Sequence, residues 1–218
     1  VIANQTKVLE FAPDVGQAIV GDPGTADVLP VSARTLYIQG KKFGTTNLTV
    51  FSGDRSQQIL FSVQVTPDIA ALKRQALTNP RQRIRICAHP STEDRLHEML
   101  IVHTRGTYVR PHKHVNKSES VPIIEGEVEI VFLDDAGAVS DVVRLGDYRS
   151  GREFYYRVGD PRFHTLLITS EFLVFHEVTN GPFRREETIF APWAPEESDA
   201  AACGAFQARV AREAAARG

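Results

Sequence analysis

The stretch GTYVRPHKHVNKSESVPIIEG, residues 106–126, decides how the rest of this chain is interpreted. It places His112 and His114 two residues apart, and successive side chains of a strand point to opposite faces, so both imidazoles emerge on one face. The polar residues 115–118 predict a hairpin turn that brings the carboxylate of Glu119 back beside the two histidines. Two imidazoles and a carboxylate from adjacent strands suit a borderline divalent metal ion. The segment therefore predicts a metal site.

The spacing of this segment resembles the first signature of the cupin superfamily. The positions that carry the resemblance are Gly106, His112, His114, Glu119 and Gly126. Cupins place one more histidine on a later strand, and the resemblance gives that role to His164. The family usually has Pro-x-Gly ahead of this histidine, whereas Gly159 and Pro161 stand here in the reverse order.

Three histidines and one glutamate imply a catalytic type of site, with one or two positions of an octahedral metal left for water, oxygen or substrate. Fe(II), Mn, Ni and Zn all suit such a donor set. The alternative is a barrel that keeps these residues without binding a metal. The remaining histidines are interpreted as ordinary core or surface residues: His89, His97, His103 and His176.

Composition excludes some classes of protein. A net charge of -2 over 218 residues provides no basic field for a phosphate backbone, so nucleic-acid binding is not expected. Cys87 and Cys203 lie far apart and predict plain thiols. No apolar run is long enough to span a bilayer, so no membrane span is expected.

Residues 1–70 differ from the rest of the chain in composition and pattern, with short alternations of apolar and polar residues and no histidine. They predict a small β-rich module with strands in residues 7–11, 35–40, 46–53 and 58–68. The order from VGDPGTADVL at residue 20 to VTPD at residue 68 resembles the N-terminal domain of pilus-assembly secretins. That family implies a periplasmic, non-catalytic module with a protein partner. The alternative is a folded spacer.

The chain is predicted to be mainly β, with the N-terminal module followed by an antiparallel cupin barrel, a double-stranded β-helix, and short flanking helices. Residues 71–80 form a helical linker, residues 81–197 the barrel and residues 198–218 a helical tail. A helix is expected over residues 91–100, with Ser91 as its cap. Hairpins are expected around residues 134–137 and over residues 166–178.

Three further side chains are candidates for the site. Tyr108 and Arg110 share strand parity with His112, so both are predicted to line the barrel interior. Arg110 is the candidate for holding an anionic group, the alternative being a salt bridge at the rim. Tyr108 and Glu125 are the candidates for moving protons.

Several separated motifs resemble the WbuC family of cupin-fold metalloproteins, associated with bacterial surface-polysaccharide gene clusters. They are RICAHPS (85–91), GTYVRPHKH (106–114), NGPF (180–183) and FAPWAPEE (190–197). The resemblance implies a carbohydrate or small anionic ligand. It does not distinguish oxygenase, isomerase or hydrolase-like chemistry.

Two hypotheses follow for function. The first is a metal-dependent enzyme acting on a small oxygenated substrate, and the second is a non-catalytic binding or assembly module tethered to a pilus or secretion system. A gene fusion without joint function is a third. The N-terminal resemblance implies the periplasm and the cupin resemblance the cytoplasm, so the compartment stays open, as does homo-oligomerisation.

Overall fold

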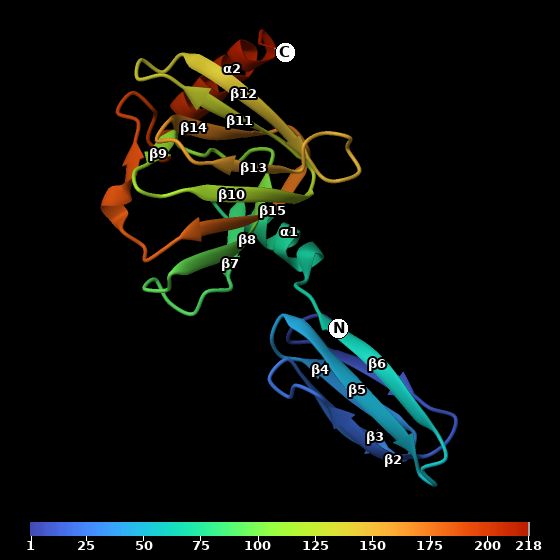
Figure 1. Ribbon diagram of the computed structural model, residues 1–218. Coiled ribbons are helices and arrows are strands. Elements are labelled where there is room, and N and C mark those ends of the chain that lie inside the picture. Colours follow the sequence, from blue (N-terminus) through green and yellow to red (C-terminus); the bar gives the residue numbers. More distant parts are fainter. Residues whose placement is uncertain (218) are drawn as a thin grey trace. The chain divides into compact units, whose positions relative to one another are not determined.

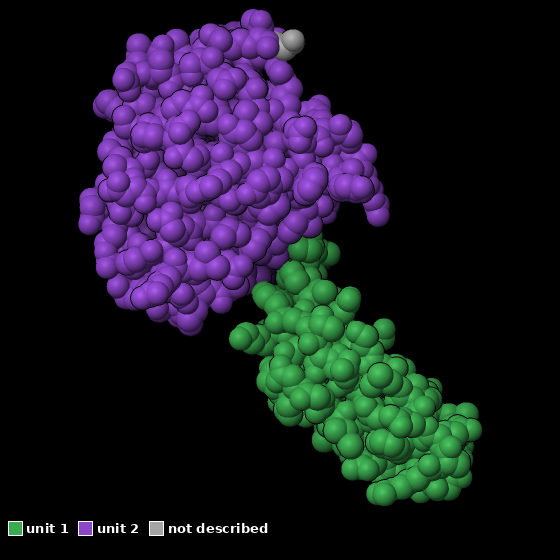
Figure 2. Space-filling view, in the orientation of Figure 1, with its two compact units in different colours: residues 1–70 green, residues 71–218 purple. Residues whose placement is uncertain are grey.

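The computed structural model describes residues 1–217 (Figure 1), which divide into two compact units at Ala70 and Ala71 (Figure 2). Each unit has its own apolar core. We describe the two units separately.

The first unit is built from two three-stranded antiparallel sheets, with strand orders β1-β4-β3 and β2-β5-β6. Alternation of apolar and polar residues turns one face of each strand inward, and Leu36, Ile38, Leu48 and Val50 form the centre of the core. This confirms the predicted β-rich module. The strands are β1 (Thr6–Glu10), β2 (Val15–Val20), β3 (Ala26–Ser32), β4 (Thr35–Gly40), β5 (Gly44–Ser52) and β6 (Gln58–Val65).

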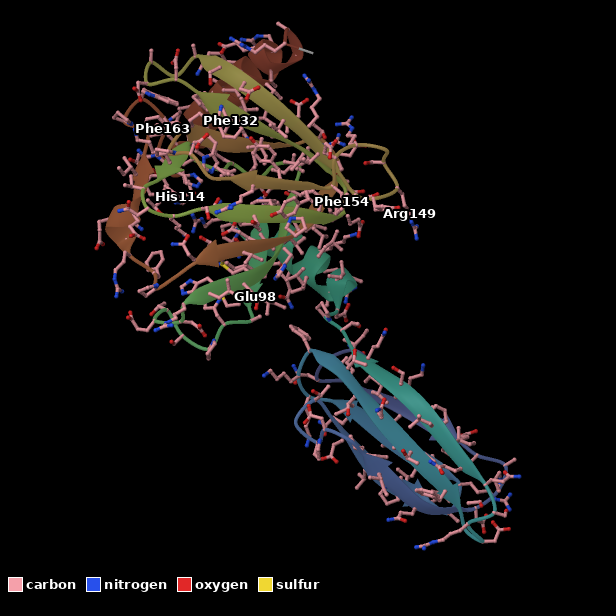
Figure 3. All side chains as sticks on the ribbon, viewed as in Figure 1. Glu98, His114, Phe132, Arg149, Phe154 and Phe163 are labelled. Carbon is pink, nitrogen blue, oxygen red and sulfur yellow. The ribbon has the colours of Figure 1, made fainter. Side chains whose placement is uncertain are left out.

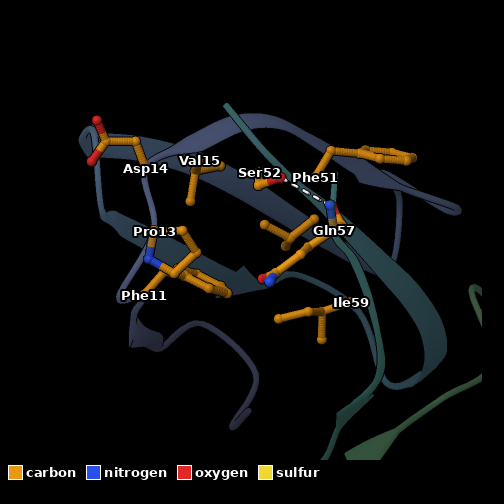
Figure 4. A pocket seen from close by; sticks show the side chains of 9 residues that line it. Phe11, Pro13, Asp14, Val15, Phe51, Ser52, Gln57 and Ile59 are labelled. Atoms are coloured by element: carbon orange, nitrogen blue, oxygen red, sulfur yellow. Dashed lines mark hydrogen bonds between the residues drawn. The ribbon is translucent and has the colours of Figure 1, made fainter. Parts of the chain in front are cut away.

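A depression in this unit lies beside Phe11, Val15 and Ile59, where Ser52 Oγ accepts a hydrogen bond from the backbone N–H of Gln57 (Figure 4). Its volume of about 10 Å³ is near the space that a single water molecule needs. The depression is too small for a ligand.

The second unit contains two five-stranded antiparallel sheets, with strand orders β13-β10-β15-β8-β7 and β12-β11-β14-β9-β16. The two sheets share one apolar core that includes Ile101, Val121, Ile130, Phe132 and Phe175. Two antiparallel sheets around a shared core form the cupin barrel, which confirms the expected fold class. The strands are β7 (Arg83–Cys87), β8 (Leu96–Thr104), β9 (His112–His114), β10 (Glu119–Glu125), β11 (Glu127–Leu133), β12 (Val139–Gly146), β13 (Tyr155–Val158), β14 (Phe163–Ile168), β15 (Phe172–Asn180) and β16 (Thr188–Phe190).

Helices flank the barrel. Helix α1 (Ile69–Thr78) starts just before the unit boundary and has most of its residues in the second unit, and α2 (Ala200–Ala215) is the last element of the described chain. The side chain of Asp199 caps α2 by accepting a hydrogen bond from the backbone N–H of Ala202 at 2.9 Å. Phe206 and Val210 of α2 pack with Val131 and Leu167 of the second sheet, so the tail covers that sheet as predicted.

The helix predicted over residues 91–100 is wrong. Residues 96–104 form β8, which pairs with β15 on one side and β7 on the other. His97, Met99 and Ile101 are buried at every second position, the period of a strand. Hydrogen bonding to two neighbouring strands therefore overrides the helical spacing of the apolar residues.

Two predicted hairpins are also wrong, because each joins strands of different sheets. Residues 115–118 connect β9, which pairs with β14 and β16, to β10, which pairs with β13 and β15. Likewise β14 and β15, in residues 166–178, belong to opposite sheets. The hairpin at residues 134–137 does form between β11 and β12, with Gly137 at φ +86°. Crossing from sheet to sheet is what closes the barrel.

Candidate metal centre

Four predicted ligand residues converge in the second unit. His112 and His114 lie on β9, His164 lies opposite His112 on β14, and Glu119 begins β10 of the other sheet. One ligand atom from each residue lies within 4.8 Å of every other, so the group could hold a metal ion. Figure 3 shows where His114 lies in the unit. The crossing of residues 115–118 thus brings the carboxylate to the imidazoles from the facing sheet.

The backbone fixes the tautomer of two of the imidazoles. Nδ1 of His112 lies 2.9 Å from the carbonyl oxygen of Arg110, and Nδ1 of His164 lies 3.1 Å from that of Arg162. A carbonyl oxygen can only accept, so each Nδ1 must carry the hydrogen and donate it. Each Nε2 therefore keeps a lone pair for a metal ion.

His114 has the same arrangement with a side-chain partner. Its Nδ1 lies 3.2 Å from Oγ1 of Thr188 on β16. Its Nε2 lies 2.7 Å from Oε1 of Glu119 but outside hydrogen-bond geometry, and this buried nitrogen has no hydrogen-bond partner in residues 1–217. A buried nitrogen and a carboxylate oxygen this close without a hydrogen bond fit two ligands of one ion. The residues present therefore fit a divalent metal.

Burial and mutual proximity set the protonation states. Burial, followed by the neighbouring His164, lowers the pKa of His112 to about 3, so its imidazole is neutral at pH 7. Burial alone would raise the pKa of Glu119, but the adjacent imidazoles outweigh it and hold that pKa well below its ordinary value. Neutral imidazole and ionised carboxylate are the forms that bind metals.

The four residues open onto a cavity of about 550 Å³ inside the barrel. This volume is within the usual range for sites of small molecules. Its wall also carries Glu177 and several cationic side chains that the sequence analysis did not single out: Arg81, Arg83, Arg85, Lys117 and Arg185. The alternation in RIRIC, which puts Arg83 and Arg85 on one face of β7, was a usable signal for two of them.

Tyr108 and Arg110 do not line this cavity, which corrects the parity argument. Strand β9 begins only at His112, so alternation does not extend back through Pro111. Tyr108 instead packs against Phe206, and its hydroxyl donates to the carbonyl oxygen of Pro195 at 3.0 Å.

Arg110 forms the salt bridge that was the alternative to anion binding. Its Nη1 lies 2.6 Å from Oε2 of Glu196, and its guanidinium lies over the ring of Phe190, 5.0 Å from the centroid. Glu125 ends β10 and pairs with Lys73 of α1, also away from the cavity lining. The structure therefore does not bring Tyr108, Arg110 or Glu125 to the metal cluster, by which we mean the four candidate ligand residues His112, His114, Glu119 and His164.

Comparisons with known proteins support the two-part architecture. Residues 1–66 match a family described as the pilus formation protein N-terminal region. Residues 65–145 match a domain of unknown function, DUF6016, a range that includes His112, His114 and Glu119 but ends before His164. Among curated proteins there is no match.

Solved structures of low identity resemble the chain. A double-stranded β-helix protein from Klebsiella pneumoniae is 14% identical over 50% of this chain and 79% of its own, with a TM-score of 0.39. A cupin superfamily protein from Desulfitobacterium hafniense is 19% identical over 54% and 93%, with a TM-score of 0.37. L-ribose isomerase from Cellulomonas parahominis is 15% identical over 51% and 70%, with a TM-score of 0.41. Likenesses of this size do not bear on the reaction of this chain.

The site and the fold define a cupin-like β-barrel unit whose His and Glu cluster can hold a metal ion. The same chain carries, in residues 1–66, a match to the pilus formation protein N-terminal region. Neither α1 nor α2, the α-helices in residues 1–217, is long and apolar enough to cross a membrane.

Proposed function

We propose that the second unit is a metal-dependent cupin with His112, His114, Glu119 and His164 as its ligands, and that it binds a small oxygen-rich molecule, sugar-derived or anionic. The observation that carries the proposal is the convergence of four ligand atoms, three imidazole nitrogens and a carboxylate oxygen, at the wall of a cavity. The backbone carbonyl groups that fix the tautomers of His112 and His164 also support their roles as metal ligands through Nε2.

The donor set leaves room for chemistry. A divalent ion with four protein ligands keeps one or two positions for other groups, where it would polarise a carbonyl or activate water or dioxygen. Fe(II), Mn, Ni and Zn all suit three imidazoles and a carboxylate. The cavity wall supplies ligand-binding groups around this point, and Phe183 offers an exposed flat apolar face there.

The sequence resemblance to WbuC-type cupins supports a link to surface-polysaccharide metabolism, with a sugar derivative as the ligand. Residues 1–66 support a second role, since a pilus-formation module implies a protein partner. In this proposal the first unit tethers the cupin to a secretion or pilus assembly. A non-catalytic sensor of the same ligand is the competing function, and the cavity suits it equally.

Metal content tests the ligand assignment. We expect the purified protein to carry about one divalent ion per chain by elemental analysis, and His112→Ala/His114→Ala to carry less than about a tenth of that. The control is His89→Ala/His176→Ala, which removes two histidines outside the cluster. Equal metal content in the two double variants would show that the assignment is wrong.

Turnover separates the enzyme from the sensor. The metal-loaded protein is incubated with candidate sugars and sugar phosphates, and the products are followed by mass spectrometry. Conversion that requires His112 and His114 establishes an enzyme. Tight binding without conversion favours the non-catalytic module.

A further inference from the structure

The cavity beside the metal cluster has a cationic wall that three separate chain segments build. Strand β7 contributes Arg83 and Arg85, and Arg81 lies two residues before this strand. Lys117 comes from the crossing between β9 and β10. Arg185 begins the short 3-10 helix η1 (Arg185–Glu187) that leads into β16. Segments distant in sequence thus place like charges around one space, which costs energy unless an anion offsets their repulsion.

Two of these cations already have an anionic partner. Arg81 Nη2 lies 2.5 Å from Oε2 of Glu197, and Arg83 Nη2 lies 2.9 Å from Oε1 of the same carboxylate. Arg83 also donates to the carbonyl oxygen of Tyr108 at 3.2 Å. One carboxylate thus pairs with both guanidinium groups and offsets one of their two positive charges.

The other three have no such partner. Within residues 1–217, Arg85, Lys117 and Arg185 take part in no ion pair. Arg85 Nη1 lies 3.8 Å from the sulfur of Met99, and the guanidinium of Arg185 lies 5.6 Å from the ring centroid of Phe190. Three cations that line a ligand-sized cavity thus form no close ion pair within residues 1–217 and can bind an anion.

The carboxylates of the wall offset this charge only in part. Glu119 belongs to the four-residue cluster, and a divalent ion there exceeds its single negative charge. Glu177, the other carboxylate in the lining, interacts electrostatically with Lys117 and Arg85, and it offsets at most one of the three positive charges. With a metal bound, the cavity therefore presents a net positive surface to its contents.

We propose that the cavity takes a small anionic ligand, one with a phosphate or carboxylate group, and that Arg85, Lys117 and Arg185 hold that group while another oxygen faces the metal. The inference rests on the proposed function, because it names the charge class of the ligand of the same site. Guanidinium groups bind such anions with two parallel hydrogen bonds, and a lysine adds a mobile point charge. A neutral sugar would leave all three cations without a counter-charge.

Calorimetric titration with inorganic phosphate and with citrate tests the proposal and distinguishes the two anion types. Wild-type protein loaded with metal is compared with Arg85→Gln/Lys117→Gln/Arg185→Gln. The control, Arg74→Gln/Arg149→Gln/Arg212→Gln, removes the same charge from exposed positions outside the cavity lining. Arg149, for example, lies in a loop well away from His114 (Figure 3).

We expect at least one of the two anions to bind wild type and the control alike, and the cavity variant to bind it about tenfold or more weakly. Glucose, a neutral probe, should bind all three proteins equally or not at all. Equal affinity in the cavity variant and wild type, equal weakening in the control, or no binding of either anion to wild type would each overturn the proposal.

Metal content of the same samples separates this inference from the proposed function. Full metal content with unchanged anion binding in the cavity variant would refute only the anion site. If wild-type protein took up no metal and still bound phosphate through these three residues, the proposed function would be refuted and the anion site would stand.

Discussion

At the scale of single residues, the three histidines of the cluster have the same orientation. Nδ1 of each ring lies beside an oxygen atom, which leaves Nε2 for the candidate metal position. For His112 and His164 the oxygen belongs to a backbone carbonyl, which a substitution cannot remove. For His114 it is Oγ1 of Thr188, which can be removed without changing side-chain volume. Partners that orient a ligand in this way typically change metal affinity when they are lost.

The variant Thr188→Val should therefore bind metal more weakly, by about tenfold to a hundredfold, because the ring of His114 loses the contact that orients it. Competition with a chromophoric chelator measures the dissociation constant. The control is Thr78→Val at the end of α1, which keeps the same chemistry away from the cluster. Unchanged affinity in Thr188→Val would mean that packing alone orients His114.

His103 predicts a pH dependence of folding stability. Burial, helped by the neighbouring Arg83, lowers its pKa from 6.5 to about 3. The folded state thus binds fewer protons than the unfolded chain between these values, so the free energy of unfolding falls as the pH drops from 6.5 towards 3. From pH 7 to pH 4 this residue accounts for a loss of up to about 3 kcal/mol.

Replacing His103 with leucine should remove that part of the acid sensitivity. Urea unfolding of wild type and His103→Leu at pH 7 and pH 4 gives the two differences to compare. Metal is removed from both proteins by chelation beforehand, so that acid release of the ion does not contribute. If both proteins lose the same stability on acidification, His103 does not titrate on unfolding as inferred.

The sequence predicted the metal cluster better than its surroundings, for a physical reason. Two histidines at strand spacing, with Glu119 shortly after them, are a local pattern, and the resemblance to cupins supplied His164. The fold brings all four residues together. Tyr108 and Arg110 failed because parity holds only inside a strand, and β9 begins at His112. The cationic wall depends on three distant segments, which no local pattern relates.

At the scale of elements, the sequence patterns predicted the positions of strands more reliably than they predicted which strands pair with each other. Leu96, Met99 and Leu100 have helical apolar spacing, and the neighbours on both sides, β7 and β15, select the strand over residues 96–104. Turn chemistry identified the real hairpin at Gly137, where a tight turn needs positive φ. It could not show that residues 115–118 cross between sheets, because sheet membership is decided by long-range pairing.

Substitution by alanine should change the stability in opposite directions at two glycines, Gly126 between β10 and β11 and Gly204 on α2. Gly126 has φ +90°, and a Cβ there would lie 2.1 Å from the backbone oxygen of Phe172, so Gly126→Ala should destabilise the unit by several kcal/mol. Gly204 is exposed and its Cβ would meet open space, so Gly204→Ala should stabilise α2 by about 1 kcal/mol.

Denaturant unfolding of these two variants measures both effects in one experiment. The opposite signs make the pair its own control, since each variant adds one methyl group. A Gly126→Ala protein as stable as wild type would mean that the turn between β10 and β11 can change conformation freely. A destabilised Gly204→Ala would indicate that α2 packs more tightly around this position.

At the scale of the whole molecule, the chain forms two units, each with its own apolar core. The first unit is centred on residues such as Leu36 and Val50, and the second on residues such as Ile130 and Phe175. All four metal-cluster residues belong to the second unit, and the family match of residues 1–66 belongs to the first. A ligand of the cluster should therefore act on the stability of one core alone.

Calorimetry of the full chain should accordingly resolve two unfolding transitions, of which only one depends on metal. An ion that binds only the folded state adds about 3 kcal/mol to the stability of its unit at a free concentration of 100 times its dissociation constant. Chelation should lower the melting temperature of that transition and leave the other in place. In His112→Ala/His114→Ala, neither transition should respond to metal or chelator. A single transition, or two that shift together, would mean that the two cores unfold as one cooperative structure and that metal binding stabilises the whole chain.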